Sequence, residues 1–336
     1  MERENYFSLP YISSSSLHWF ERSPLYCRKR MLKEIDDAHA SYLDLGNQIH
    51  MRVLEPDKYE ECYTVLDFEK PTSKNQMGFA KEYADLLKLG VDEAEALLTA
   101  YKNNYSTKNT SDKSIQTNAE ELLKELDKFV SYLLLQDKYK EILSSSKNIL
   151  IESVHSALQA NKKANELLFD SNSLFSVEGK ETYSELPIVW DFPIYFDDEP
   201  ILKCKSMLDR LIIDHTNKEI IMVDLKTTFS LEVLKKDFDR RDYLRQLSFY
   251  WLSVQQFLSN RNQENIFEEY TKKTFVVIAT TDPSVIETRV ISFTYEEVIE
   301  KQFEIIKMIQ EISWHVANDM WDHTKEYYLG DGVEKL

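Results

Sequence analysis

The chain has 336 residues, 43% of them apolar and 29% charged, a composition that is ordinary for a soluble globular protein with a sizeable buried core. No stretch approaches the roughly 20 consecutive apolar residues of a membrane span, and residues 1–6 carry charges instead of an apolar signal core, so we expect a cytoplasmic protein. The net charge of −17 argues against nonspecific coating of nucleic acid, because phosphate binding depends on lysine and arginine, but a local basic groove stays open.

The first predicted helix follows a run of serines at residues 13–16. Serine at this place can cap a helix that begins near Leu17, and Ser23-Pro24 then turns or restarts the chain. Residues 22–33 form a basic segment that contains the consecutive residues Arg28, Lys29 and Arg30. This segment is a candidate for contacts with a nucleic-acid backbone.

A second predicted helix covers residues 43–55 and ends at Pro56. His50 lies on its apolar stripe, where a histidine is by default a buried core residue, so the spacing alone leaves its role open. Gly46, one turn earlier, leaves room for the close approach of backbone or ligand. Residues 57–150 are mostly helical by pattern, apart from a polar interruption at residues 103–114 that predicts an exposed loop.

Strand patterns begin at residue 182. Residues 182–194 alternate between apolar and other residues, and residues 205–213 and 219–228 form a predicted hairpin around a polar turn at 214–218. A helix at 240–258, strands at 274–280 and 285–294 and a closing helix at 295–318 follow. This order indicates an α/β core with a mixed sheet.

The hairpin carries the strongest chemical pattern of the sequence. Side chains alternate along a strand, so Asp224 and Lys226 share a face, and Asp209 can lie beside them from the neighbouring strand. The carbonyl of Leu225 could add an oxygen ligand. Carboxylates and an ammonium on one sheet surface suit a divalent cation and an activated water that cut a phosphodiester, with Lys226 orienting the water or offsetting charge. A hairpin with surface Asp and Lys is the alternative.

Other residues are weaker candidates by spacing alone. Gln246 and Tyr250 share one helix face, which is also the pattern of a helix that packs on a sheet. Glu185 begins the strand before the hairpin and could add a carboxylate near a metal. A second basic concentration contains Arg240, Arg241 and Arg245 and is a further candidate for backbone contacts. Acidic neighbours dilute it, so a solvated helix face is the alternative.

Several classes of site have no support in the sequence. Cys27, Cys62 and Cys204 form no C-x-x-C pair, which argues against an iron–sulfur cluster or a structural zinc site and favours free thiols. With only six glycines, the chain contains no glycine-rich phosphate loop, no dinucleotide motif and no G-x-S-x-G.

Several motifs, in order, resemble the PD-(D/E)xK nuclease superfamily and within it the exonuclease VIII-like branch of phages and prophages. The central ones are L-D-R at residues 208–210, where Leu208 replaces the usual proline, and V-D-L-K-T-T at residues 223–228. Flanking matches are I-S-x-S…S-P at residues 12–24, G-x-x-x-H at 46–50, L-E-P at 54–56, C-K at 204–205 and Q-x-x-x-Y at 246–250.

The resemblance implies a restriction-endonuclease-like α/β fold, in which a central mixed β-sheet is flanked by helices. Residues 1–64 would supply N-terminal helices to the active site, residues 65–180 a mostly helical insert, and residues 181–336 the nuclease core. His50 would then join Asp209, Asp224 and Leu225 as a ligand of Mg²⁺, for which Mn²⁺ would substitute. Gln246 and Tyr250 would position water or phosphate.

The resemblance also implies an activity and partners. Members of this branch degrade one strand of linear duplex DNA from an end, in the 5′ to 3′ direction, and pass the exposed strand to a single-strand annealing protein. Related enzymes form rings around DNA, and a ring would let basic residues line only its channel. The setting would be a bacterial or phage-infected cell. Two alternatives stay open: a DNA-binding or assembly protein without turnover, and a structure-specific endonuclease of the same superfamily.

Overall fold

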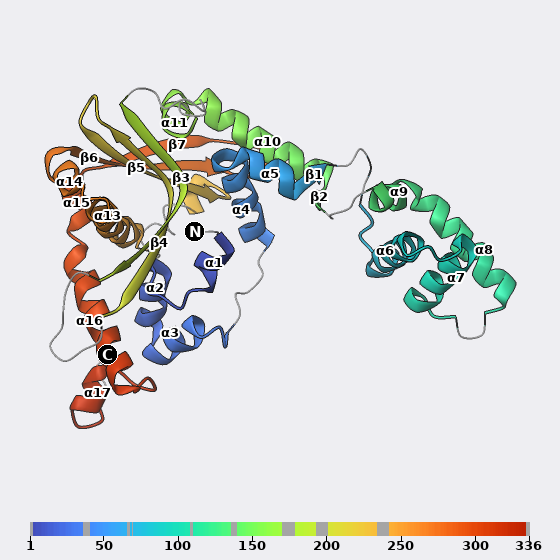
Figure 1. Cartoon of the computed structure of the whole chain (residues 1–336), viewed down its shortest axis with the longest axis horizontal. Helices are drawn as coiled ribbons and strands as arrows, with labels where there is room; N and C mark the ends of the chain where they lie inside the picture. Colours follow the sequence, from blue (N-terminus) through green and yellow to red (C-terminus); the bar gives the residue numbers. More distant parts are fainter. Residues whose placement is uncertain are drawn as a thin grey trace. The chain divides into compact units, whose positions relative to one another are not determined.

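A computed structural model describes residues 3–35, 41–65, 68, 70–107, 110–135, 140–169, 179–192, 201–233 and 242–333 (Figure 1). The chain separates into two compact units, a larger one of residues 1–56 with 153–336 and a smaller one of residues 57–152. Within the described part of the chain, no helix combines the length and the apolar character that crossing a membrane requires.

The smaller unit is a helical module with a core of its own, built around Phe79, Tyr83 and Phe129. The break between its second and third long helices falls in the polar interruption predicted at residues 103–114. Its elements are α5 (Pro56–Cys62), β1 (Tyr63–Val65), α6 (Lys74–Lys88), α7 (Glu93–Asn104), α8 (Asp112–Glu125), α9 (Asp127–Leu135) and β2 (Glu141–Leu143), and α10 (Ser145–Ala160) crosses the unit boundary. Strands β1 and β2 pair in parallel.

The larger unit contains the sheet. Its helices are α1 (Arg3–Ser8), α2 (Ser14–Arg22), α3 (Pro24–Met31), α4 (Ser41–Leu54), α11 (Lys162–Leu168), α13 (Tyr243–Ser259), α14 (Glu264–Glu269), α15 (Tyr295–Ile299), α16 (Gln302–Asn318) and α17 (Lys325–Leu329). Its strands are β3 (Lys180–Asp191), β4 (Lys203–Asp214), β5 (Glu219–Thr228), β6 (Thr271–Thr280) and β7 (Thr288–Phe293).

The five strands form one mixed sheet in the order β3-β4-β5-β6-β7. Strand β5 runs parallel to β6, and the other neighbours are antiparallel. A parallel pair needs a crossover, and α13 and α14 supply it between β5 and β6. Helix α13 packs on β3 and β4, α4 contacts β4 and β5, and α15 contacts β6 (Figure 1). The prediction of an α/β fold with a mixed sheet flanked by helices is confirmed.

Local sequence signals explain where several elements begin. Ser13 caps α2 in a reciprocal pair with Ser16, and Ser23 caps α3 with Pro24 in its first turn, which confirms the predicted serine cap and restart. The predicted closing helix at 295–318 is instead two helices, α15 and α16, with a break at residues 300–301. The amphipathic pattern runs through that break without proline or glycine, so the sequence does not mark it.

Strands β4 and β5 are paired along only part of their length. Their ladder ends at the pair formed by Arg210 and Val223, although both strands continue beyond it. Beside the continuation of β4 lies Ile12, whose N–H donates to the carbonyl of Lys203 at 2.9 Å and whose carbonyl accepts from the N–H of Lys205 at 2.7 Å. The sheet therefore opens between β4 and β5.

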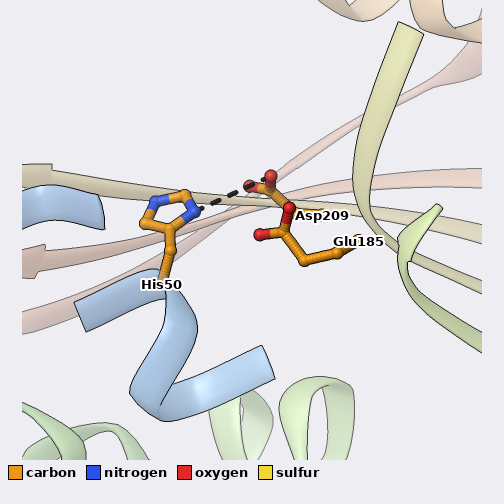
Figure 2. A group of neighbouring side chains, drawn as sticks. All are labelled: His50, Glu185 and Asp209. Atoms are coloured by element: carbon orange, nitrogen blue, oxygen red, sulfur yellow. Dashed lines mark ion pairs between the residues drawn. The ribbon is translucent and has the colours of Figure 1, made fainter. Parts of the chain in front are cut away.

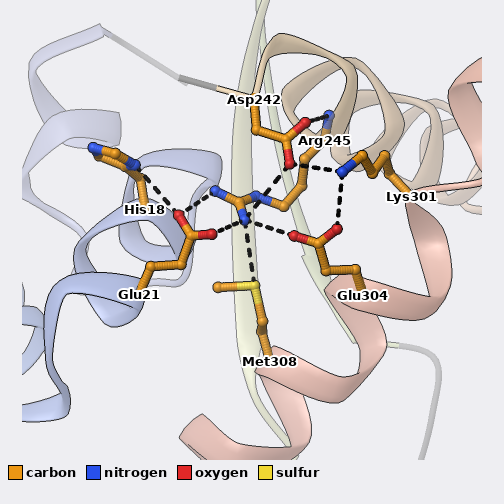
Figure 3. Close-up of polar contacts among 7 residues, drawn as sticks. All are labelled: His18, Glu21, Asp242, Arg245, Lys301, Glu304 and Met308. Carbon is orange, nitrogen blue, oxygen red and sulfur yellow. Dashed lines mark hydrogen bonds and ion pairs between the residues drawn. The ribbon is translucent and has the colours of Figure 1, made fainter. Parts of the chain in front are cut away.

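A buried arginine joins three helices of the larger unit (Figure 3). The side chain of Arg245 on α13 is only 3% exposed. Its guanidinium donates to Glu21 on α2 at 2.6 Å and to Glu304 on α16 at 2.8 Å. Lys301 adds a second cation, with bonds of 3.0 Å to Asp242 and 3.1 Å to Glu304. We call these five residues the Arg245 cluster; it fixes the start of α13 against α2 and α16.

Replacing Arg245 with methionine should destabilise the fold, because it keeps the aliphatic stem but leaves three carboxylates with Lys301 as the one remaining cation of the cluster. We expect a loss of about 2–3 kcal/mol in the free energy of unfolding, below the value for a fully buried pair because the glutamates reach solvent. Urea denaturation measures it. Arg289→Met, at an exposed pair with Glu287, is the matched control and should cost under about 1 kcal/mol. Equal losses of unfolding free energy in the two variants would show that the Arg245 cluster stabilises the fold no more than an exposed ion pair does.

Candidate metal centre

Three neighbouring strands each carry a carboxylate at the same level of the sheet. The β3–β4 ladder pairs on either side place Glu185 opposite Asp209. Asp209 and Asp224 are the next residues after the last β4–β5 ladder pair, where the two strands part. Side chains at one level of adjacent strands share a face. The larger unit therefore concentrates negative charge at the point where the sheet opens.

His50 on α4 completes a group of possible metal ligands with two of these carboxylates (Figure 2). Its Nδ1 lies 3.7 Å from Oδ1 of Asp209. One ligand atom each from His50, Glu185 and Asp209 lie within 4.8 Å of one another. An imidazole nitrogen with two carboxylate oxygens accommodates a hard divalent cation that keeps several waters. The residues present thus fit a divalent metal ion.

Gly46 permits helix α4 to lie close enough to the sheet for His50 to reach this group. A Cβ atom added at Gly46 would lie only 3.0 Å from Oγ1 of Thr227 on β5, closer than ordinary van der Waals contact. Glycine avoids that contact because it has no side chain. The expectation that Gly46 leaves room for a close approach is confirmed, and the approaching group is the β5 side chain.

Glu185 has a backbone conformation that is unusual for a strand. Its φ angle is +47°, in the left-handed region. For a residue other than glycine this conformation costs about 1 kcal/mol, and strained backbone of this kind is concentrated at functional sites. The prediction that Glu185 begins its strand is wrong: it lies inside β3, beside Asp209 and His50. A lone glutamate has no sequence pattern that would reveal this place.

Asp224, which is buried, and Lys226, which is partly exposed, form an ion pair beside the group of possible metal ligands. The Lys226 Nζ atom lies 2.7 Å from Oδ2 and 2.8 Å from Oδ1 of Asp224. Burial raises the pKa of Asp224 and outweighs the opposing attraction of Lys226. Burial acts to lower the pKa of Lys226, but Asp224 and Asp209 outweigh it, so the net pKa is raised and the ammonium form is held. Among the residues that the structure describes, the group of three possible metal ligands does not include Asp224.

Leu225 anchors Asp209 through its backbone. Its N–H donates to Oδ2 of Asp209 at 2.7 Å, which fixes one carboxylate oxygen while Oδ1 faces His50. A hydrogen bond of this kind orients a carboxylate for ligation. A role for the Leu225 carbonyl as a ligand stays a prediction.

Gln246 and Tyr250 meet on α13, as their spacing predicts. Nε2 of Gln246 donates to the Tyr250 hydroxyl at 2.8 Å. Burial raises the pKa of Tyr250 well above its ordinary value, and the negative charges of Asp224 and Asp209 raise it further. The phenol is therefore neutral and lies within electrostatic reach of both carboxylates. Tyr243 on the same helix places its ring centroid 5.3 Å from Nζ of Lys226.

The described basic residues that were expected to contact DNA lie in four different settings. Arg28 pairs with Asp319 at 2.9 Å, and Lys29 is exposed. The guanidinium of Arg30 lies 4.8 Å from the ring centroid of Trp19. Arg245 is enclosed in the Arg245 cluster, so its guanidinium faces carboxylates and we assign it no DNA contact. Arg240 and Arg241 lie outside the described residues.

Comparison with known proteins gives little direct identification. No family model matches the chain, and no curated protein matches it. A crystal structure of a candidate exonuclease from Eubacterium rectale is similar over all of this chain and 95% of its own, at 12% identity and a TM-score of 0.47. A second crystal structure, of a protein designated only by a locus tag, covers 57% of this chain and 69% of its own, at 17% identity and a TM-score of 0.24. At these TM-scores neither likeness indicates a function for this chain.

Removing the central carboxylate should weaken metal binding. Asp209→Asn deletes a charge between His50 and Glu185, and we expect the Mn²⁺ affinity measured by calorimetry to fall by about 10–100-fold or more, since even an outer partner of a ligand has an effect of that size. Asp191→Asn removes an exposed carboxylate from β3 and should leave the affinity unchanged. Unaltered Mn²⁺ binding by Asp209→Asn would remove the metal centre from this place.

The contact at Gly46 can be tested by stability. Alanine is favoured over glycine inside a helix by about 1 kcal/mol, but at Gly46 the added Cβ meets Oγ1 of Thr227. We expect Gly46→Ala to gain less than that in urea denaturation, and to gain the full amount in a Thr227→Ala background. The same gain in both backgrounds would mean that Thr227 does not limit the approach of α4.

Proposed function

We propose that this protein is a divalent-metal-dependent deoxyribonuclease. The observation that carries the proposal is the row of Glu185, Asp209 and Asp224 on adjacent strands, with His50 facing Asp209 and Lys226 paired with Asp224. Phosphodiester hydrolysis requires a metal-activated water and compensation of the charge that develops on the phosphate. The carboxylates and His50 supply ligands for the metal that activates the water, and Lys226 supplies the ammonium that compensates charge on the phosphate.

His50, Glu185 and Asp209 would hold the ion, with Mg²⁺ as the physiological metal and Mn²⁺ as a substitute. A bound divalent ion supplies Lewis-acid polarisation of the phosphate and a more acidic water. The chain's own part is to keep these ligands oriented: the Leu225 N–H fixes Asp209, and the approach of α4 at Gly46 brings His50 to it.

Lys226 would stabilise negative charge on the scissile phosphate. Its pKa is raised despite burial, because Asp224 and Asp209 favour the ammonium form. This favours charge compensation over removal of a proton from water. Tyr250 accepts a hydrogen bond from Gln246, which leaves its own O–H to donate to a phosphate oxygen or to water.

The motif resemblance supports a more specific form of the proposal. The enzyme would degrade one strand of linear duplex DNA from an end, in the 5′ to 3′ direction, for a single-strand annealing protein. Subunits would form a ring around the duplex, which suits a chain of net charge −17 because only the channel must be basic. Arg28, Lys29 and Arg30 are the described residues that we propose for backbone contacts.

Lys226→Met tests the charge-compensating role. We expect the rate of cleavage of linear duplex DNA to fall by at least about 100-fold, the effect of removing one transition-state donor, while Mn²⁺ binding persists. Lys218→Met, at an exposed lysine of the hairpin turn, should cut at the wild-type rate. Wild-type cleavage by Lys226→Met would refute the assigned role.

The choice of DNA substrate separates the remaining alternatives. Duplexes labelled at one end report polarity, and closed circular DNA should stay intact if an end is required. Cleavage of the circle would indicate an endonuclease instead. An absence of product from the wild-type protein with Mg²⁺ and with Mn²⁺ would overturn the enzyme proposal in favour of a DNA-binding protein.

A further inference from the structure

Arg210 lies on β4 at the point where the ladders on both of its sides are interrupted. It is opposite Ser184 in the ladder with β3 and opposite Val223 in the ladder with β5. The pair with Val223 is the last one between β4 and β5, and the pair with Ser184 directly precedes the level of Glu185 and Asp209. Arg210 is therefore next to the two carboxylates along the chain and across the sheet.

The side chain of Arg210 is bonded to the residue that precedes Glu185. Its Nη1 donates to Oγ of Ser184 at 2.9 Å. Arg210 is only 3% exposed, and a buried guanidinium is costly unless hydrogen-bond acceptors meet it. Hydrogen bonds from a charged donor are also stronger than those between neutral groups. We call this bond the Arg210–Ser184 clamp; it ties β3 to β4 in addition to their backbone ladder.

The backbone of Glu185 requires support of this kind. Its φ of +47° is disfavoured for a residue with a side chain, and such conformations persist only where the surrounding structure fixes them. On one side of Glu185, Leu186 pairs with Leu208 in the ladder. On the other side, Ser184 is held both by its ladder pair and by the clamp. Fixing Ser184 restricts the main chain at Glu185, and with it the direction of the Glu185 side chain.

We propose that Arg210 and Ser184 are positioning residues of the metal centre. Their bond holds the left-handed backbone of Glu185 and so keeps its carboxylate beside the ligand atoms of His50 and Asp209. Neither residue has to touch the metal ion, because each acts through the main chain of its neighbour. This inference rests on the metal ion of the proposed function, and it does not depend on whether DNA is the substrate.

Removal of the Ser184 hydroxyl tests the clamp. Ser184→Ala leaves the backbone ladder in place but takes one acceptor from Arg210, so the Glu185 carboxylate is held less firmly. We expect the Mn²⁺ affinity of the full chain to fall by about tenfold, the lower end of the effect of an outer partner of a metal ligand. Calorimetry measures it, at a temperature well below the unfolding midpoint of each variant. Ser184→Thr keeps a hydroxyl and should bind Mn²⁺ as the wild type does.

Ser206→Ala is the matched control for this change. Ser206 also lies on β4, four residues before Arg210, and is opposite Ile188 in the ladder with β3. It is buried, and its hydroxyl has no hydrogen-bond partner among the described residues. The same serine-to-alanine change in the same pair of strands should therefore leave the Mn²⁺ affinity unchanged.

Arg210→Lys tests the other half of the clamp. Lysine keeps the positive charge, but its side chain is one atom shorter and has no guanidinium fork. We expect this variant to lower the Mn²⁺ affinity about as much as Ser184→Ala does. The double variant should bind Mn²⁺ no more weakly than either single variant, because both changes remove the same contact.

The possible outcomes separate this inference from the proposed function. Wild-type Mn²⁺ affinity in Ser184→Ala, or additive losses in the double variant, would overturn the clamp even in a protein that cuts DNA. If the wild-type protein binds Mn²⁺ but cuts no DNA, the nuclease proposal fails, and the same affinities still decide the role of the clamp. Unaltered binding by Asp209→Asn would remove the metal centre itself, and the clamp with it.

Discussion

The parting of β4 from β5 is the constraint on which the rest of the site depends. A continuous ladder would cover the level of Asp209 and Asp224 with backbone hydrogen bonds and neighbouring side chains. Pairing stops one residue before Asp209 and Asp224, so the Leu225 N–H can donate to the Asp209 carboxylate. Beyond this point Ile12, in place of β5, bonds to the backbone of β4. The same opening gives α4 a place from which His50 reaches the carboxylates.

An acidic protein must also hold these carboxylates together against their mutual repulsion. Cations oppose the repulsion between carboxylates, both at the site and elsewhere in the larger unit; Arg245 is buried, whereas Lys226 and Lys301 are partly exposed. Lys226 neutralises Asp224 next to the proposed ligands, and Arg245 and Lys301 neutralise three carboxylates at the base of α13. Since α13 carries Gln246 and Tyr250, the Arg245 cluster supports the site from a distance. Buried ion pairs add little net stability by themselves, and their value here is the placement of α13.

Much of this site follows from local sequence patterns, because its parts are set by short-range geometry. The two-residue period of β5 puts Asp224 beside Lys226, and the four-residue spacing on α13 puts Gln246 beside Tyr250. The mixed sheet follows in the same way from the order of the predicted strands and helices, whereas the order of the strands within the sheet was not predicted.

What the sequence could not predict depends on contacts between distant residues. The Arg245 guanidinium meets Glu21 and Glu304, which are 224 and 59 residues away, so a basic run read locally suggests a DNA contact where the fold makes an internal one. The place of Glu185 in the metal-ligand group depends on ladder register and on a left-handed backbone, and neither has a signature in the neighbouring residues.

That left-handed backbone restricts which amino acids position 185 can accept during evolution. Glycine and asparagine would relax the main chain, because both adopt positive φ more readily, but neither brings a carboxylate. Aspartate would keep the charge and suit the backbone better, yet its side chain is one methylene shorter and reaches less far toward His50. Glutamate thus keeps the longer reach toward His50 at the cost of a strained main chain. At this position, selection for a more stable fold would oppose selection for the proposed metal ligand.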